Sequence, residues 1–458
     1  THGPLDETFG SPFLALQLRS EVLRDKPDFD HLWGGDTQRQ NIAACKSLSA
    51  ILLPILGFSN RPDLVLGLFA HFLACPVLGI AQGAYEQGLA YTKERPSAEA
   101  WQPSRKVQGE FEPIKTSVPG MEISEIFPQL AKQMHQAALI RSIKGTNGDH
   151  GRAQYELQTG FNQAPNVMHP GLGSIVVHER EPLGDLPAFI SISGNPARAG
   201  YLGQKCEAYY VGRPGDKDPY LAFPEGIHHE RGKKRLEILA RMNARTSGEL
   251  GASQLKASEV ALKDAIALME SPALKAFELE NEKPATIERY GNTEFGRGAL
   301  LARRLVEQGV RFVQVNRGGF DNHGNIFEAM RNHGAIMDPA LASLLSDLKA
   351  NGLIKKTLVV VLSEFGRTPR INDGGGRDHW ARCFSAFMAG GGIKGGTIVG
   401  ASDPDGMDPA ERIVKPFDLH ASICHALGID LQKEIITTQG RPMRLLRKDG
   451  QPIKELFV

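Results

Sequence analysis

A helix-then-strand pattern that recurs in the second half of the chain limits the fold more than any other feature of the sequence. Residues 338–366, DPALASLLSDLKANGLIKKTLVVVLSEFG, predict a helix capped by Asp338, with Pro339 in its first turn and a stop near Gly352. The continuous apolar run TLVVVL follows, without the polar alternation of a half-exposed strand. Such strands, spaced by helices, predict an α/β fold with a mostly parallel central sheet flanked by helices on both faces.

Other segments follow the same plan. FGRGALLARRLVEQGVRFVQVN predicts a helix, a glycine stop at Gly309 and a strand. Further strands are expected in ALIRSI, PAFISIS and CFSAFMAGGGI, and further helices in DLHASICHALGI and over residues 253–283. An amphipathic helix capped by Ser124 is expected in SEIFPQLAKQMHQ.

Composition excludes several classes of protein. The 53 basic and 52 acidic residues give a net charge of +1, which argues against a nucleic-acid partner. The five cysteines are scattered without paired spacing, so neither a zinc ribbon nor a disulfide scaffold is expected, although one disulfide stays open.

The chain divides into an N-terminal region, residues 1–106, of unclear status, and a domain over residues 107–458. The apolar stretch 61–85 is interrupted by His71 and Pro76, which favours a buried strand or helix over an integral membrane span. No basic and apolar leader is visible at the start, so the sequence shows no export signal and leaves the location open.

Acidic residues, histidines and arginines gather in the loops that border the expected strands. In parallel sheets, ligands bind beyond the carboxyl ends of the strands, so these side chains are expected to share one edge. The candidate metal ligands are Asp149, Asp321, His323, Glu364, Asp378 and His379. Mixed oxygen and nitrogen ligands suit a divalent metal, Zn²⁺ or Mn²⁺, Ca²⁺ or Mg²⁺, with imidazole favouring the transition metals.

Three further residues are candidates for catalysis. His150 stands at a helix start, where backbone N–H groups favour an oxyanion, and Arg152 and Arg367 suit a phosphate or sulfate group. Ordinary structural roles stay open for the candidates: Asp149 as a helix cap, Asp321 as a turn cap, Glu364 paired with an arginine, and His379 as a loop residue. His333, His420 and His425 lie in expected helices and are interpreted as structural.

Several long motifs together resemble a known family. FDNHGN, SEFGRTPRI, GGRDHWARCFSAFMAGGGIKGG and DLHASICHALGI are similar to the sulfatase-like domain-of-unknown-function family 1501 of the alkaline phosphatase-like superfamily, over residues 107–458. The resemblance implies an alkaline phosphatase-like fold and a metal-dependent hydrolase of phosphate or sulfate esters. It also implies a bacterial protein, periplasmic or extracellular, acting on a small anionic ester such as a sulfated or phosphorylated carbohydrate.

The resemblance extends to single positions. Glu364 falls where superfamily members keep an aspartate ligand, and Phe365 replaces a polar neighbour. Asp321 with His323 resembles an acid-and-histidine metal pair, and His379 resembles a late histidine ligand.

Two departures from the superfamily bear on activity. HGRAQYELQTG is similar to the sulfatase signature but has His150 at the nucleophile position, which argues against the formylglycine route and leaves nucleophile, base or ligand open for it. The early Gly-Gly-x-Ser-x-x-Asp-Thr-Phe-Asp block has only a faint echo in GPLDETFG, with Asp6. The alternative function is therefore a non-catalytic binding or scaffold protein with a degenerate metal site.

Overall fold

The computed structural model describes residues 66–72, 107, 109–216, 221, 229–246, 266–437 and 440–457. The chain forms two compact units, residues 1–56 with 219–269, and residues 57–218 with 270–458. In the first unit the structure describes helix α6 (His229–Thr246), which exposes the apolar residues Ile238, Leu239 and Met242. The candidate site residues all belong to the second unit, which is described below.

An eight-stranded sheet organises the second unit, in the order β12-β4-β11-β8-β1-β7-β5-β6. Its strands are β1 (Leu66–Phe72), β4 (Ala137–Ile143), β5 (Phe189–Ile192), β6 (Tyr209–Val211), β7 (Phe312–Arg317), β8 (Thr357–Leu362), β11 (Phe384–Gly390) and β12 (Thr397–Val399).

The sheet is mixed rather than wholly parallel: the expectation of a mostly parallel sheet holds for the described strands other than β11. Strands β8, β1, β7, β5 and β6 run parallel to one another, as do β12 and β4. Strand β11 runs antiparallel to both of its neighbours, β4 and β8. An apolar run buried on both faces carries no information about its direction, so the sequence pattern could not distinguish β11 from the rest.

Strand β1 lies in the centre of the sheet, between β7 and β8. In its register Ala70 pairs with Val315 on one side and with Val361 on the other. The expectation of a strand or helix in the apolar stretch 61–85 is therefore confirmed as a strand over residues 66–72, and the rest of that stretch lies outside the described residues. In the part of the chain that the structure describes, no helix has both the length and the apolarity needed to cross a membrane.

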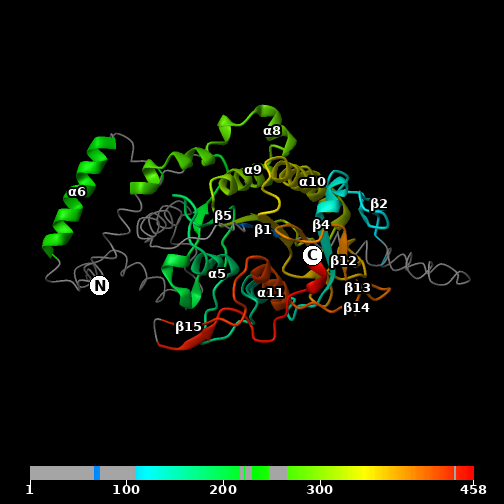
Figure 1. The fold of residues 1–458 in the computed structure, drawn as a ribbon. Helices are drawn as coiled ribbons and strands as arrows, with labels where there is room; N and C mark the ends of the chain where they lie inside the picture. The colour runs from blue at the N-terminus through cyan, green and yellow to red at the C-terminus, as the bar shows by residue number, and fades with distance from the viewer. Residues whose placement is uncertain are drawn as a thin grey trace, which may run out of the picture. The chain divides into compact units, whose positions relative to one another are not determined.

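Helices cover both faces of the sheet (Figure 1). Helices α9 and α10 lie on one side, and α5 and α11 lie on the other. The helices of this unit are α4 (His150–Thr159), α5 (Leu172–Glu179), α8 (Pro284–Arg289), α9 (Glu294–Glu307), α10 (Ile326–Ala350) and α11 (Pro416–Ala426). The expected helices at α9 and α11 are confirmed, and so are the strands β4, β5, β7, β8 and β11.

Helix α10 corrects the predicted helix start at Asp338. It begins twelve residues earlier, at Ile326, and continues through Asp338 and Pro339 to Ala350. The buried Asp338 carboxylate accepts hydrogen bonds from the backbone N–H groups of Gln129 (3.0 Å) and Leu130 (2.7 Å) rather than capping its own helix. Tertiary contacts thus outweigh the helix-breaking tendency of an internal proline.

Two other predicted helices are also different in the structure. Ser124 ends strand β3 (Glu122–Ser124), and the following helix is the 3₁₀ helix η3 (Leu130–Gln136), because Pro128 disfavours helical geometry at the residue before it. In the predicted helix 253–283, residues 253–265 lie outside the described part. Residues 266–270 are α-helical, as predicted, and the portion after them forms the 3₁₀ helices η7 (Pro272–Phe277) and η8 (Leu279–Asn281).

Short two-stranded sheets and 3₁₀ turns complete the unit. The pairs are β2 (Pro113–Lys115) with β3, β9 (Gly366–Arg367) with β10 (His379–Trp380), β13 (Ala401–Ser402) with β14 (Pro409–Glu411), and β15 (Glu434–Ile436) with β16 (Pro442–Arg444). The turns are η4 (Gly200–Leu202), η5 (Gln204–Cys206) and η9 (Lys454–Leu456). The β9–β10 pair carries two of the candidate site residues, since Arg367 is paired with His379.

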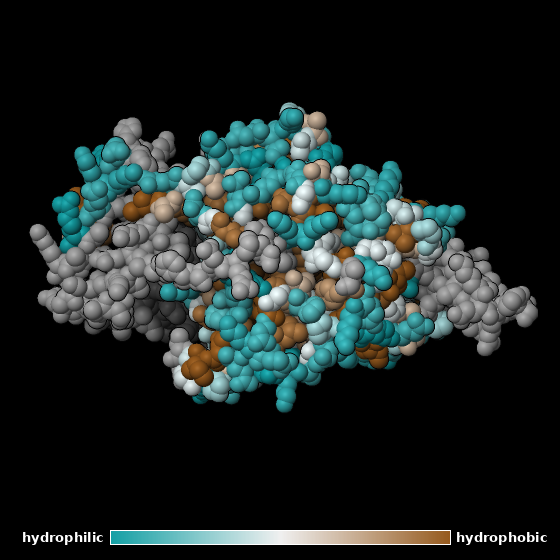
Figure 2. Space-filling view, viewed as in Figure 1, coloured by the Kyte–Doolittle hydropathy of each residue, from teal (hydrophilic) through white to brown (hydrophobic). Residues whose placement is uncertain are grey.

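The core lies against the central strands. Val360 of β8 and Met388 of β11 are fully buried, and Phe312 of β7 packs edge-on against Phe189 of β5. On the face shown in Figure 2 the described surface is mostly hydrophilic. The sheet is therefore a rigid platform whose loops carry the polar chemistry.

The buried acceptor at Asp338 yields a prediction about stability. Asp338→Ala should lower the free energy of unfolding by about 1–3 kcal/mol, because two backbone N–H groups of the η3 region lose their acceptor. Equilibrium urea unfolding measures the change. Ser346→Ala, at an exposed position of the same helix, should change it by less than about 0.5 kcal/mol. Equal effects of the two substitutions would contradict the role given to Asp338.

Candidate metal centre

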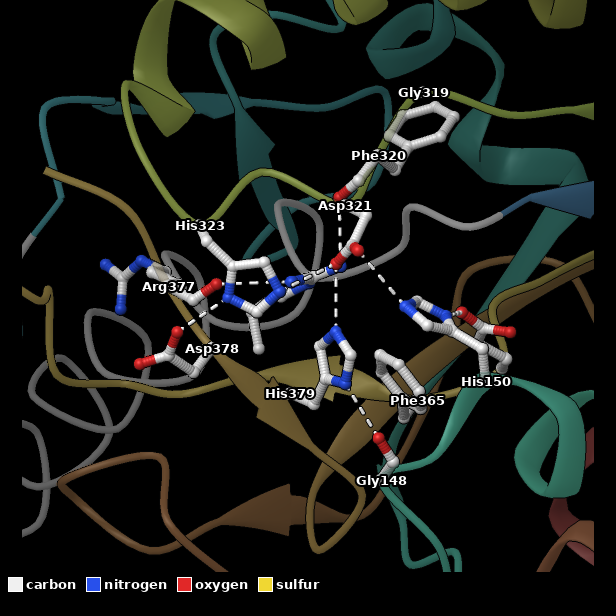
Figure 3. A network of polar contacts seen from close by, with 12 residues as sticks. Gly148, His150, Gly319, Phe320, Asp321, His323, Phe365, Arg377, Asp378 and His379 are labelled. Carbon is white, nitrogen blue, oxygen red and sulfur yellow. Dashed lines mark hydrogen bonds and ion pairs between the residues drawn. The ribbon is translucent and has the colours of Figure 1, made fainter. Parts of the chain in front are cut away.

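Loops from distant parts of the chain meet around Asp321 (Figure 3). Asp321 and His323 follow strand β7, Glu364 follows β8, and His379 begins β10. His150, the first residue of α4, approaches from a segment more than 170 residues earlier in the chain. Sequence reasoning placed these residues at one edge of the sheet, and the structure brings their side chains into direct contact.

The Asp321 carboxylate receives four nitrogen atoms. Its Oδ1 lies 2.7 Å from Arg367 Nη2, 2.9 Å from His379 Nε2 and 3.0 Å from His323 Nε2. Its Oδ2 lies 3.2 Å from His150 Nε2. Burial favours a higher pKa for Asp321, but its hydrogen bonds with His379 and Arg367 hold that pKa well below the ordinary value. The carboxylate is therefore ionised at neutral pH.

The three histidines share one arrangement. Each presents Nε2 to Asp321 and holds Nδ1 against an oxygen atom. That oxygen is Glu364 Oε1 for His150, Asp378 Oδ1 (2.7 Å) for His323, and the Gly148 carbonyl oxygen (2.7 Å) for His379. A backbone carbonyl or an ionised carboxylate only accepts hydrogen bonds, so each Nδ1 carries a proton. In the neutral imidazole, Nε2 then bears a lone pair aimed at the carboxylate.

That geometry is repulsive unless a positive charge intervenes. A lone pair on Nε2 facing a carboxylate oxygen brings two acceptors together, so either the imidazoles take up protons or a cation lies among them. Burial lowers the pKa of His150, but contacts with Glu364 and Asp321 outweigh it and raise that pKa above the ordinary value. The ligand atoms of His150, Asp321 and His379 all lie within 4.8 Å of one another, close enough to hold one metal ion.

Glu364 stands behind His150 and is almost completely buried, with 4% of its surface exposed. Burial raises the pKa of Glu364, and His150 and Gln154 lower it in part. Its Oε2 makes no hydrogen bond of acceptable geometry within the described residues, although the Gln154 side chain is near enough to act on its charge. A buried carboxylate oxygen left in this state is costly unless a cation or proton is close.

Arg367 lies underneath Asp321 and is only 1% exposed. Besides Asp321, its guanidinium donates to the carbonyl oxygens of Phe320 (3.1 Å) and Arg377 (3.2 Å). Those bonds direct the guanidinium into the protein and away from solvent. In this position Arg367 orients the Asp321 loop.

Phe365 occupies the position where a polar residue was expected from the resemblance. It is buried, and its ring packs against the imidazoles of His379 (centroids 4.5 Å apart) and His150 (5.2 Å). The aromatic wall fixes both ring planes without competing for their nitrogen atoms.

The His323 loop requires a glycine at position 376. A Cβ on Gly376 would lie 2.1 Å from the backbone carbon of His323, so the two segments approach as closely as two backbones can. Asn372 joins the same segments, because its Nδ2 donates to the His323 carbonyl at 3.0 Å. On the other side, His333 contacts the Gly319 carbonyl at 2.8 Å and stacks on Phe320.

Two sequence-predicted residues have other surroundings. Asp149 caps α4, with Oδ1 accepting from the Arg152 backbone N–H at 3.1 Å, and no contact links its side chain to the Asp321 cluster. The exposed Arg152 side chain lines an open cleft of about 850 Å³ next to the cluster. Asp6 lies outside the described residues.

Sequence reasoning missed the Gly148 carbonyl, Asn372 and the cleft. Every residue has a carbonyl, so no residue type marks Gly148 as the acceptor for His379. Asn372 stands in a glycine-rich loop, which is the signal that could have drawn attention to it.

Solved structures similar to this chain include members of the alkaline phosphatase superfamily and sulfatases. A protein in the alkaline phosphatase superfamily from Vibrio parahaemolyticus is 11% identical, with a TM-score of 0.34, over 86% of this chain and 76% of that one. PsFucS1 sulfatase from Pseudoalteromonas sp. is 13% identical, with a TM-score of 0.36, over 86% and 72%. TAB5 alkaline phosphatase with bound Mg is 12% identical, with a TM-score of 0.31, over 81% and 100%.

Among curated proteins, no relative matches the chain. A family described as a protein of unknown function, DUF1501, matches residues 83–457, so the match begins earlier than residue 107, where the motifs begin to resemble it. This match covers most of the sequence, and the chain belongs to the DUF1501 family.

Proposed function

We propose that this protein is a metal-dependent hydrolase of phosphate or sulfate esters. One observation carries the proposal: three imidazoles present Nε2 to a single carboxylate while an oxygen acceptor fixes each Nδ1. Second-sphere acceptors of this kind are characteristic of metal-binding histidines, because they fix the tautomer and the ring orientation.

The donor set fits a divalent transition metal. Asp321 and the Nε2 atoms of His150 and His379 would hold it, and His323 Nε2 lies beside them, 3.0 Å from Asp321 Oδ1. Such nitrogen-containing sites favour a transition metal such as Zn²⁺ over Mg²⁺ or Ca²⁺. When bound, the metal would polarise an ester oxygen and lower the pKa of a coordinated water.

The other acidic residues have supporting roles in this proposal. Glu364 and Asp378 hold the Nδ1 protons of His150 and His323, and Asp149 starts α4. This assignment narrows the ligand set expected from the sequence, in which Glu364, Asp378 and Asp149 were also ligands. His150 has both nitrogens in contact with carboxylates, which favours a ligand or proton-holding role over that of a covalent nucleophile.

The arginines divide between two tasks. Arg367 positions Asp321 from below and partly offsets its charge, so we no longer assign it to the substrate. Arg152 lies in the first turn of α4, exposed to solvent, where its charge adds to the positive end of the helix. We propose that Arg152 attracts the small anionic ester. A periplasmic or extracellular location stays a prediction from the family resemblance.

One observation favours the alternative, a non-catalytic scaffold. Arg367 already supplies a positive charge 2.7 Å from Asp321, and a buried guanidinium in this position can replace a metal as the partner of the carboxylate. In that reading, protonated histidines satisfy the remaining acceptors. Metal content separates the two proposals directly.

Metal binding is the first prediction of the hydrolase proposal. The purified protein, loaded with Zn²⁺ and dialysed, should retain stoichiometric metal by elemental analysis, and Asp321→Ala or His379→Ala should abolish that retention. His425→Ala, at an exposed position of α11, serves as the control and should retain the metal. Unchanged stoichiometry in both site variants would reject the assignment.

Second-sphere roles give a graded prediction. Glu364→Gln and Asp378→Asn should weaken Zn²⁺ binding by about 10–100-fold without abolishing it, because each replaces the charged acceptor of an imidazole Nδ1 proton by a neutral amide oxygen. Asp149→Asn, which keeps a capping oxygen, should leave the affinity unchanged. Isothermal titration with Zn²⁺ measures all three, and complete loss of binding in Glu364→Gln would instead make Glu364 a ligand.

Hydrolysis itself is tested with aryl esters. The Zn²⁺- or Mn²⁺-loaded protein should release the phenol from an aryl phosphate or aryl sulfate, and a chelator or the Asp321→Ala substitution should stop the release. A protein that binds metal stoichiometrically and hydrolyses neither ester in the presence of Zn²⁺, Mn²⁺ or Ca²⁺ would exclude the proposed activity.

A further inference from the structure

The cleft next to the metal centre is lined mainly by amide, phenol and guanidinium groups. Its lining residues are Asn147, Arg152, Tyr155, Asn162, Gln163, Ala164, Pro165, Asn166, Val167 and Met168. Two of them adjoin the cluster along the chain. Arg152 follows His150 by two residues, and Asn147 precedes Gly148, whose carbonyl accepts the His379 hydrogen bond. A ligand in the cleft would therefore border on the metal centre.

The cleft is too large for an inorganic anion alone. Its volume of about 850 Å³ falls within the roughly 300–1,000 Å³ of sites that bind small organic molecules. The size suits an organic group of more than one ring. With one cation and several amides in the lining, the cleft is neither the basic groove of a nucleic-acid binder nor the apolar one of a lipid binder.

Several polar groups in the cleft have no partner within the protein. The side chains of Arg152, Gln163 and Asn166 make no hydrogen bond or ion pair with another described residue, and all three are exposed. Each amide both donates and accepts, as a hydroxyl group does. Tyr155, Pro165 and Met168 add apolar surface beside them, which suits the C–H faces of a sugar ring.

The wall of the cleft is pre-organised. Helix α4 ends at Gly160 in the left-handed conformation (φ 76°), and the chain then turns into the segment 161–168. Phe161 stacks on the buried His169 ring with centroids 4.0 Å apart, and Tyr155 Oη lies 2.8 Å from both His169 Nδ1 and the His169 backbone nitrogen. The His169 backbone N–H donates to Tyr155 Oη, so both ends of the segment are fixed to α4.

We infer that this cleft binds the alcohol portion of the substrate and that this portion is a carbohydrate carrying an additional anionic group. Gln163 and Asn166 bind its hydroxyl groups, and Arg152 binds the second anion. The inference rests on the proposed function, because that function places the scissile ester at the cluster. The inference itself concerns binding, which can be measured without turnover.

The test uses the full-length, metal-free protein and a panel of neutral, sulfated and phosphorylated tetrasaccharides, with binding followed by isothermal titration. At least one charged tetrasaccharide should bind. The double variant Gln163→Ala, Asn166→Ala should weaken its binding about tenfold or more, since two hydrogen-bonding groups are lost. Arg152→Ala should remove the preference for charged over neutral tetrasaccharides. Gln451→Ala, an exposed amide outside the cleft, should have no effect.

The outcomes separate this inference from the proposed activity. Failure of every tetrasaccharide to bind, or binding that the cleft variants leave unchanged, would overturn the inference even if aryl esters are hydrolysed. Binding that depends on Gln163, Asn166 and Arg152 in a protein that hydrolyses no ester would support the cleft and overturn the hydrolase instead.

Discussion

The contact on which the site depends is the convergence of four nitrogen atoms on the Asp321 carboxylate. An isolated carboxylate at a loop tip would be solvated by water and would order nothing around it. Here Arg367, fixed by backbone carbonyls and almost fully buried, holds Oδ1 from below, and the histidines close over it from three directions. The loops after β7, β8 and β9 are therefore ordered by one anion that they share.

The sheet explains how residues so far apart in sequence reach this anion. Strands β7 and β8 are not neighbours, because β1 lies between them. The loops that carry Asp321 and Glu364 therefore start one strand apart at the edge of the sheet. His150, between the two, contacts both carboxylates through opposite ring nitrogens. No residue of the cluster follows the antiparallel strand β11. His379 lies before it in the chain, in β10.

Local sequence signals could predict much of the fold and the residue types of the site. The α9–β7 and β8 segments were predicted correctly because their apolar patterns and their glycine stops agree. The helix starts predicted at Asp338 and Ser124 were wrong, although both residue types are common helix caps. Asp338 instead accepts a hydrogen bond from a distant segment, and Ser124 ends a strand. Local sequence signals could not predict the role of each residue within the site. That Glu364 contacts an imidazole, and that Arg367 points inward, follows from tertiary packing that no spacing in the sequence encodes.

Charge offers an argument for why a divalent cation in particular would suit the cluster. The carboxylates of Asp321, Glu364 and Asp378 contact the three histidines, and Arg367 is the guanidinium that pairs with them. With neutral imidazoles, three negative charges against one positive leave a charge of two, negative, at a partly buried position. Either two protons on the imidazoles or one divalent ion restores neutrality, and the two compete for the same Nε2 lone pairs. The carboxylates of Glu364 and Asp321, which raise the pKa of His150, are the same negative charges that would attract the ion.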